Sequence, residues 1–290
     1  MRRFVLCADD FALSDPVSRA IVDLVDQGRL GAVSCLVTSV HWRTHAAELR
    51  HRGKRVDVGL HLNLIADEML HHDPGYRSAL GSYPTLPMLI LRSQLRRLDR
   101  QQIAVEIERQ LDRFVDGFGA LPDFVDGHRH VHQLPVVRDA LLDVYRKRLA
   151  DRSCYVRNVR RVIHSRSAKF KARVVAALGA GRLEAALLAE RIPHNRRFGG
   201  IYDFSPDADF PGLMRAWLSQ VEASDLIMCH PARTDTTAAD PIGAARSREY
   251  AYLNSDTFTA DCERASVRPG RFRDRSGAGT NVFSGNDRHD

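Results

Sequence analysis

The chain has 290 residues, of which 44% are hydrophobic and 27% charged, and it carries a formal net charge of +7. This length and balance indicate a soluble globular protein that buries a sizeable core. The sequence contains no apolar run of about 18 residues, the length that a membrane span needs. The opening "MRRFVLCADDF" becomes acidic before a signal-like segment develops, so we expect neither a membrane span nor a secretory signal, and a cytoplasmic location.

Cysteine usage and charge patterning narrow the possible functions. The five cysteines are scattered and form no CxxC pair, which argues against a disulfide framework or a cysteine zinc site. Residues 146–197 hold 15 Lys/Arg against three acidic residues. Such a segment could contact nucleic acid, lipid headgroups or an anionic substrate, although most charge runs are solvated helical faces. No nucleic-acid-binding motif accompanies it, so we expect no nucleic-acid partner.

The first third of the chain alternates predicted strands and helices. "RRFVLC" is a buried strand that runs into "ADD", and Ser14 begins a helix that ends at Gly28. "AVSCLVTS" is a second strand, a short helix follows over 41–52, and "VDVGLHLNL" is a third strand.

The middle of the chain begins with an irregular stretch. Residues 65–99 contain three prolines, and we expect them to run over the surface without regular structure. Apolar residues at helical spacing over 103–115 then predict a helix, "DFVDGH" a fourth strand, and "VVRDALLDVYRKRL" another helix.

The remaining predicted strands are "CYVRNV", "GGIYDF" and "DLIMCH", with inserted basic helices at about 160–195 and a helix around 210–222. Alternating strands and helices predict an α/β fold, a distorted (β/α) TIM-like barrel of about seven parallel strands. We expect one such domain over residues 1–265 and a disordered tail over 266–290, because the tail lacks periodicity and is rich in Gly, Arg, Asp and Ser.

Unusual polar residues fall at the ends of four predicted strands. Asp9 and Asp10 end the first strand, His61 lies near the end of the third, His128 ends the fourth and His230 the last. In a parallel β/α barrel these ends meet at one mouth, where such enzymes keep their active sites. Each residue alone has an ordinary explanation as a cap, a core histidine or a loop residue, but four together favour a site.

Three histidines in "DGHRHVHQLP" add to this pattern. His128, His130 and His132 are spaced by two, and an extended chain would direct all three to one side. One carboxylate and two imidazoles form the ligand set of a catalytic divalent metal that keeps positions open, and the set suits Zn, Mn, Co or Mg. Because Asp9 and Asp10 are adjacent, we expect one to bind the ion and the other to take a proton.

Four motifs together resemble those of the YdjC-like carbohydrate deacetylases: "VLCADDFALS", "VGLHLNL", "DGHRHVHQLP" and "IMCHPA", in this order. The resemblance covers roughly residues 3–258. It implies a distorted β/α barrel, a divalent metal, and hydrolysis of the N-acetyl group of an amino sugar to a free amine and acetate.

By position in these motifs, the resemblance implies that Asp10, His61 and His128 are the metal ligands and Asp9 the general base. His230 is the candidate acid that gives a proton to the leaving amine. Within the "HRHVH" run, His130 and His132 stay open as alternatives to His128 for the ligand.

Several neighbouring residues receive supporting roles. His130 and His132 are expected to line the pocket or to orient the ligand. Arg157, at the end of the fifth strand, is expected either to bind a sugar hydroxyl or phosphate at the mouth or to be a surface arginine. Arg246 and Glu249, three apart on a predicted helix, are expected to pair with one another.

Two positions depart from the family pattern. The family usually has Gly at the position of Ala12, so the backbone there is in question if that residue needs a positive φ. A small polar residue is common where this chain has Gly127.

Two other functions stay open at this point. The chain could be another metal-dependent amidohydrolase or a phosphodiesterase on the same frame. Alternatively, it could be a non-catalytic protein that binds nucleic acid or a membrane surface through the basic segment. The partner expected first is an N-acetylated amino sugar, and a homodimer is one assembly open to such a chain.

Overall fold

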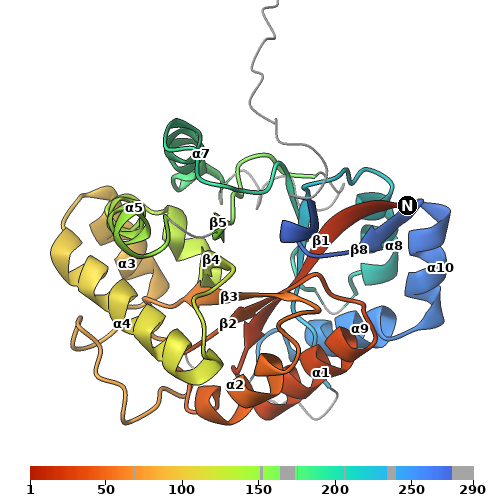
Figure 1. Cartoon of the computed structure of the whole chain (residues 1–290), viewed down its shortest axis with the longest axis horizontal. Helices are drawn as coiled ribbons and strands as arrows, with labels where there is room; N and C mark the ends of the chain where they lie inside the picture. Colours follow the sequence, from red (N-terminus) through yellow and green to blue (C-terminus); the bar gives the residue numbers. More distant parts are fainter. Residues whose placement is uncertain are drawn as a thin grey trace, which may run out of the picture.

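The computed structural model describes residues 1–67, 69–150, 153–163, 174, 176–205, 207–233 and 240–275 (Figure 1). The strands in it are β1 Arg2–Phe11, β2 Ala32–Cys35, β3 Asp57–Leu62, β4 Phe124–Gly127, β5 Tyr155–Val156, β6 Phe198–Gly199, β7 Leu226–Cys229 and β8 Val267–Pro269. The helices are α1 Asp15–Asp26, α2 Trp42–Arg50, α3 Leu86–Gln94, α4 Arg100–Phe118, η1 His128–Gln133, α5 Val137–Arg148, α7 Ala180–Ala189, α8 Phe210–Leu218, α9 Gly243–Leu253, α10 Asp256–Arg264 and η2 Arg273–Arg275.

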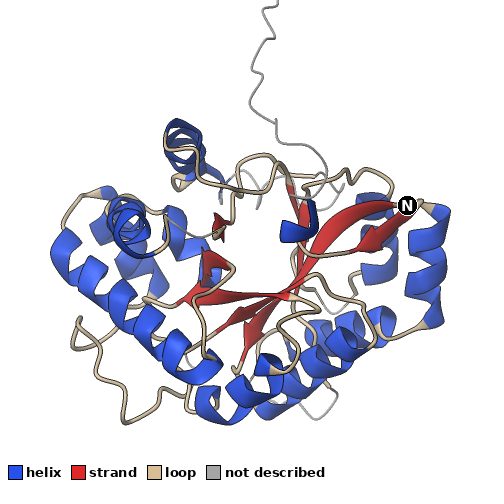
Figure 2. Ribbon diagram, in the orientation of Figure 1, coloured by secondary structure: helices blue, strands red, loops and turns tan. Residues whose placement is uncertain are grey.

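The strands form one curled parallel sheet. Their order is β5-β4-β3-β2-β1-β7-β6, and β8 pairs with β1 off this path. Helices surround the outside of the sheet, as Figures 1 and 2 show. Two isolated parallel bridges, Val156 to His194 and Val162 to Phe198, connect the β5 side of the curl to the β6 side. The predicted distorted (β/α) barrel of seven parallel strands is confirmed.

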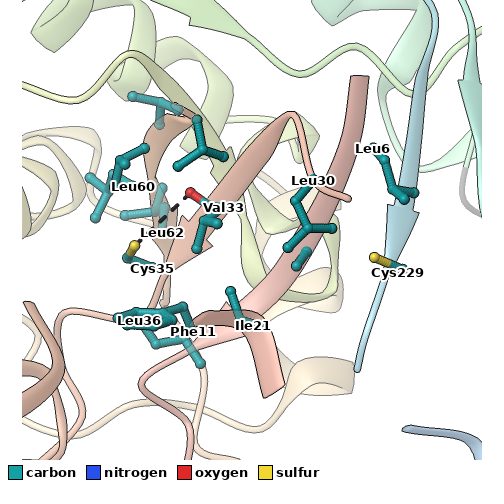
Figure 3. Close-up of a cluster of buried hydrophobic side chains, with 14 of the residues drawn as sticks. Leu6, Phe11, Ile21, Leu30, Val33, Cys35, Leu36, Leu60, Leu62 and Cys229 are labelled. Atoms are coloured by element: carbon teal, nitrogen blue, oxygen red, sulfur yellow. Dashed lines mark hydrogen bonds between the residues drawn. The ribbon is translucent and has the colours of Figure 1, made fainter. Parts of the chain in front are cut away.

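Alternate strand residues form a buried layer between the sheet and the helices. Leu6 of β1, Val33 of β2 and Leu60 of β3 pack there with Ile21 of α1, and all four are fully buried (Figure 3). Because successive strand residues point to opposite faces, this layer takes every second residue of each strand.

The intervening strand residues form a second buried cluster on the concave side of the sheet. It contains Val5 and Cys7 of β1, Phe124 of β4 and Tyr155 of β5. The rings of Phe124 and Tyr155 stack with centroids 4.9 Å apart. This inner series sets which polar residues face the mouth of the barrel.

Three predicted elements differ in detail. Helix α3 lies inside the stretch 65–99 that we expected to be irregular, because Pro87 is tolerated in the first turn of a helix. Strand β6 covers only Phe198–Gly199, so it lies before most of the predicted strand "GGIYDF". Of the predicted basic helices, α7 is present, and residues 164–173 and 175 lie outside the described part of the chain. Among the described residues, no helix is both long and apolar enough to cross a bilayer.

The prediction of a disordered tail over 266–290 is wrong for the first residues of this stretch. Strand β8 pairs in parallel with β1, and the N–H of Gly270 donates to the carbonyl of Phe4 at 2.9 Å. Arg273 then forms an ion pair with the buried carboxylate of Asp57 at 2.7 Å. These contacts order the segment, and the composition of the segment alone could not predict them. Residues 276–290 lie outside the described range.

Gly31 provides a test of this packing. A Cβ at Gly31 would lie 2.1 Å from the carbonyl oxygen of Gly270, so Gly31→Ala forces the backbone of the C-terminal segment to move. We expect the free energy of unfolding, measured by urea denaturation, to fall by about 1–3 kcal/mol.

The matched control is Gly181→Ala, which adds the same methyl group within α7, where the nearest atom is the Arg160 side chain at 3.5 Å. This change is expected to leave stability equal or slightly higher. Equal stability of Gly31→Ala and the native chain would contradict the close packing of residues 31 and 270.

Candidate metal and catalytic site

The inner-facing residues of several strands continue into polar side chains at the carboxyl ends. These are Asp9 on β1, His61 on β3, Asp126 on β4, Arg157 just after β5 and His230 just after β7. Each lies two residues beyond an inner-facing neighbour, so the period of two directs all of them to one space. All line or underlie one end of the barrel, as predicted for Asp9, His61 and His230.

Asp10 reaches the same space through an irregularity in β1. A regular strand would direct Asp10 to the face opposite Asp9, but the register with β2 shifts between Ala8 and Phe11. Asp10 has a φ of 68° and Ala12 a φ of 72°. A β-bulge of this kind re-aims a side chain, and left-handed backbone at non-glycine residues often marks a functional site. The position of Ala12 does need a positive φ, which explains the glycine usual in the family pattern.

The histidine run does not have the extended conformation that we predicted. Residues 128–133 form the short 3-10 helix η1, and Arg129 and His130 have φ values of 53° and 59°. The spacing of two therefore does not place the three imidazoles on one side. Each of them has different neighbours.

Only His128 of this run joins the metal-ligand candidates. Its Nδ1 lies 3.0 Å from Oδ1 of Asp10. His132 is fully buried, and its Nε2 lies 2.9 Å from the carbonyl oxygen of Arg157. His130 lines the cavity with its ring edge-on to Phe198 at 5.5 Å.

Gly127 leaves the room that His132 occupies. A Cβ at Gly127 would lie 2.8 Å from the backbone nitrogen of His132 and 3.0 Å from its Nδ1. The close approach of His132 in the tight turn into η1 therefore accounts for glycine at position 127, where the family commonly has a small polar residue.

Asp10, His61 and His128 form a compact group. One ligand atom from each lies within 4.8 Å of the others, and all three side chains are buried. Nε2 of His61 is 3.4 Å from the same Oδ1 of Asp10 that faces His128. The structure thus brings together the one carboxylate and two imidazoles that the motifs predicted as a ligand set.

Both histidines are held from behind by carboxylates. Nδ1 of His61 lies 2.6 Å from Oδ1 of Asp126, which also accepts a hydrogen bond from Ser34 at 2.6 Å. Nε2 of His128 lies 3.0 Å from Oδ2 of Asp67. Carboxylates that anchor the outer nitrogen of a histidine are typical of metal sites, because they fix the ring and raise its basicity.

Asp10 is held in a similar way by Arg246 of α9. Nη2 of Arg246 donates to Oδ2 of Asp10 at 2.7 Å, which leaves Oδ1 directed at the two histidines. Burial favours the neutral acid, but Arg246 and His128 together hold the pKa of Asp10 well below its usual range. Asp10 is therefore an anion in this site.

The electrostatics of the group favour a cation between these residues. Burial opposes protonation of His61, but Asp126 and Asp10 outweigh burial and raise its pKa to about 10. Without another cation, His61 therefore supplies the positive charge itself. A divalent ion and a proton on His61 therefore compete for the negative charge of the same carboxylates.

Arg157 lies neither at the mouth nor on the surface, the two positions considered for it above, but beneath the site in a supporting position. It is fully buried and donates to both oxygens of Asp9 at 2.6 Å. The same guanidinium is 2.6 Å from Oδ2 of Asp126 and 3.0 Å from the sulfur of Cys7. Its physical role is to neutralise two buried carboxylates and to fix the orientation of Asp9.

His230 lies beside Asp9, with 4.0 Å between its Nε2 and Oδ2 of Asp9. Burial lowers the pKa of His230 to about 4, so its ring is neutral near pH 7. This finding differs from the expectation that a protonated His230 waits for the leaving amine.

Glu249 positions the backbone of His230, and it does not pair with Arg246 as we expected. Its carboxylate accepts hydrogen bonds from the N–H of His230 at 2.5 Å and from the hydroxyl of Tyr202 at 2.6 Å. Arg246 instead bridges Asp10 and Asp240. Burial raises the pKa of Glu249 to about 7.

Sequence reasoning missed Asp126, Asp67, Arg246 and Glu249 as parts of this site. Asp126 had a usable signal, because it lies two residues beyond the buried Phe124 in the inner series. Asp67 lies in an irregular loop, and Arg246 and Glu249 lie on a helix after the last motif. Their positions depend on tertiary packing that no local pattern encodes.

Two other groups of potential ligands lie in the described residues. Cys7, Asp9 and Asp126 surround the guanidinium of Arg157, which fills the position that an ion would take. The second group is Asp15, His41 and His45, in which both ring nitrogens of His45 already lie close to carboxylates. The first group reaches the cavity above Asp10 only through Asp9, and none of the three residues of the second group lines that cavity.

The basic segment is largely paired where it is described. Acidic residues of neighbouring elements face many of its side chains, in the ion pairs Arg146–Glu190, Lys147–Glu108, Arg148–Asp112, Arg161–Glu184 and Arg197–Asp225. A nucleic-acid-binding surface needs unpaired basic side chains, so the described part of this segment gives that alternative little support.

A cavity of about 330 Å³ opens above the group. Asp9, Asp10, His61, His128 and His230 all line it, together with apolar residues from surrounding segments. A concave site with converging perturbed acids and imidazoles is the usual form of a small-molecule catalytic site.

Two curated deacetylases are similar in sequence to about half of this chain. A chitooligosaccharide deacetylase of Yersinia pestis (strain Pestoides F) is 33% identical over 133 residues, which are 46% of this chain and 51% of that protein. A carbohydrate deacetylase of Danio rerio is 30% identical over 158 residues, 49% of this chain and 46% of that protein. The chain spans about half the length of the curated relatives it matches.

A solved structure shares the fold over almost the whole chain. This Enterococcus faecalis V583 protein, a candidate cellobiose-phosphate cleavage protein, has a TM-score of 0.71 and 18% identity, covering 94% of this chain and 98% of its own. At this identity the likeness concerns the fold alone. The sequence model of YdjC-like proteins, in contrast, matches residues 3–264. The chain belongs to the YdjC-like protein family.

Proposed function

We propose that this chain is a divalent-metal-dependent hydrolase that removes the N-acetyl group from an amino sugar. The observation that carries the proposal is the convergence of Asp10, His61 and His128, each anchored by its own outer partner, with the carboxylate of Asp9 beside them. The deacetylase names of the two curated relatives support the same reaction.

The residues fit a divalent ion. Two histidine nitrogens and one carboxylate oxygen face one another, the outer atoms of all three side chains are bonded elsewhere, and the surrounding charge favours a cation. Three protein ligands leave further positions for water and substrate, as in catalytic sites, and Zn, Mn, Co and Mg all accept this set. A bound ion of this kind lowers the pKa of a water and polarises a carbonyl oxygen.

Asp9 is the proposed general base. Arg157 holds both of its oxygens, so the carboxylate has a fixed orientation at the floor of the cavity. From there it takes one proton from the water that attacks the acetyl carbon. Proton transfer by a positioned side chain contributes about 10²- to 10⁴-fold in such reactions.

His230 is the proposed partner of Asp9 in proton transfer. Because its ring is neutral before the reaction, the proton that the amine needs has to reach Nε2 during the reaction. Asp9 is the nearest described source, 4.0 Å away. Breaking of the C–N bond then takes this proton from His230 to the amine nitrogen, and acetate keeps the oxygen of the water.

The other two histidines of the run have supporting roles in this proposal. His130 lines the cavity and contacts the substrate, whereas His132 fixes the carbonyl of Arg157 and so the segment that carries the guanidinium. Arg157 acts as a positioning residue through Asp9 and Asp126.

The cytoplasm remains the proposed location. All five cysteines are buried and free, which suits a reducing compartment.

The direct test is release of acetate. We expect the metal-loaded chain to release acetate from N,N′-diacetylchitobiose or another N-acetylglucosamine conjugate, to lose this activity with a chelator, and to regain it with one of Zn, Mn, Co or Mg. Turnover of phosphodiesters or cyclic amides without any acetate release would favour the other metal-dependent hydrolases instead.

The ligand assignment predicts a difference between two neighbouring histidines. His128→Ala removes a proposed ligand and is expected to lower the bound metal to under about one tenth of an equivalent, because two ligands hold an ion poorly. His130→Ala alters the same 3-10 segment but no proposed ligand, so its metal content should stay near that of the native chain. Metal analysis of both dialysed proteins checks the assignment, and a metal-replete, active His128→Ala protein would refute it.

Asp67 offers a test of the anchoring carboxylates. Asp67→Asn keeps the size of the side chain but weakens the contact with Nε2 of His128, and metal affinity should fall about 10- to 100-fold. Competition with a fluorescent chelator measures this affinity. Asp116→Asn, on the exposed face of α4, is the control and should leave the affinity unchanged. Equal affinities for the two variants would show that Asp67 does not support the ligand.

A further inference from the structure

The walls of the cavity above Asp10 are mainly aliphatic. Leu86 and Ile90 of α3 line it together with Met69, Leu178 and Ile242, which belong to three other segments. All five side chains are only half-buried. They therefore leave apolar surface exposed around a concave opening that leads to the proposed reaction site.

Hydrogen-bonding groups are concentrated at the polar end of this cavity. The described lining contains no Ser, Thr, Asn, Gln, Tyr or Trp. Outside the proposed reacting groups, the charged residues of the lining that the structure describes are Asp67 and Arg129 next to His128, and Asp240, which Arg246 already binds. A chain of several sugar units has hydroxyl groups along its whole length, and the aliphatic side chains of the described wall offer these hydroxyls no partners.

Exposed aliphatic walls contribute favourably to binding only when an apolar group of the ligand covers them. Converging, half-exposed aliphatic side chains usually mark a ligand site, and each buried methylene adds favourable free energy. The acetyl group has a single methyl, which is far too small to cover residues of four separate segments. The group that covers the walls must therefore belong to the other side of the scissile amide.

We propose that the substrate is amphiphilic: an N-acetylated amino sugar that carries an aliphatic chain. The sugar lies at the polar end near Asp67 and Arg129, and the chain lies along Leu86, Ile90 and Leu178. This inference rests on the deacetylase function proposed above and specifies its substrate class. No bond to the aliphatic chain breaks in the reaction.

Binding of alkyl glycosides tests the inference without requiring turnover. Methyl, hexyl and octyl glycosides of N-acetylglucosamine are titrated calorimetrically into the metal-loaded full chain, below their micellar concentrations. We expect Kd to fall about 10- to 100-fold from methyl to octyl, because each buried methylene strengthens binding. Equal Kd values for the methyl and octyl glycosides would overturn the proposal.

Two neighbouring residues of α3 form a matched pair of variants. Ile90 lines the cavity, whereas Leu91 points away from it and is 53% exposed. Ile90→Ser should weaken octyl glycoside binding about three- to tenfold and methyl glycoside binding by less, and Leu91→Ser should alter neither. Leu86→Ser repeats the test if Ile90→Ser does not fold. Native octyl affinity in both cavity variants would also overturn the proposal.

Acetate release separates this inference from the proposed function. Acetate release from N,N′-diacetylchitobiose, with no effect of chain length on binding, would overturn the amphiphilic substrate and leave the deacetylase function standing. Binding that strengthens with chain length, with no acetate from any conjugate, would support apolar recognition by the cavity and overturn the deacetylase function.

Discussion

The site depends on one buried ion-pair group, in which the guanidinium of Arg157 lies between the carboxylates of Asp9 and Asp126. All three side chains are almost completely buried, and two carboxylates this close could not both stay ionised without a cation. Asp126 in turn orients His61, and Asp9 faces the cavity. A single arginine therefore sets the geometry of a proposed ligand and of the proposed base.

The same group links distant parts of the barrel wall. Asp9 belongs to β1, Asp126 to β4, and Arg157 follows β5, so the contacts cross the concave side of the sheet. Arg246 adds a second link, from α9 to Asp10 on β1. Removing one member would leave an uncompensated buried charge, which typically costs about 3–5 kcal/mol. Loss of a single member of the group would therefore destabilise the fold, even where that member is not a proposed ligand or base.

Much of this arrangement follows from local sequence patterns. Alternation of short apolar strands with amphipathic helices was sufficient to predict the barrel, and the rule that parallel strands end at one mouth predicted that the residues ending β1 and β3 lie at the same end. The bulge at Asp10 and the 3-10 turn at His130 could not be predicted, because left-handed backbone at non-glycine residues is set by tertiary packing. The partner residues Asp67 and Arg246 escaped prediction for the same reason, since their contacts join segments far apart in sequence.

Backbone pairing in the wall of the barrel differs from one pair of neighbouring strands to the next. From β5 through β1 to β7, backbone ladders join neighbouring strands, whereas the β5 and β6 sides meet through isolated bridges and the side chain of Asn195, which bonds the backbone of Asn158. In the described residues, the seam has two isolated bridges, whereas the ladders between the central strands each pair three or four residues. A bulky molecule entering the barrel would therefore widen it along the seam, while the strands that carry the aspartates and His61 keep their spacing.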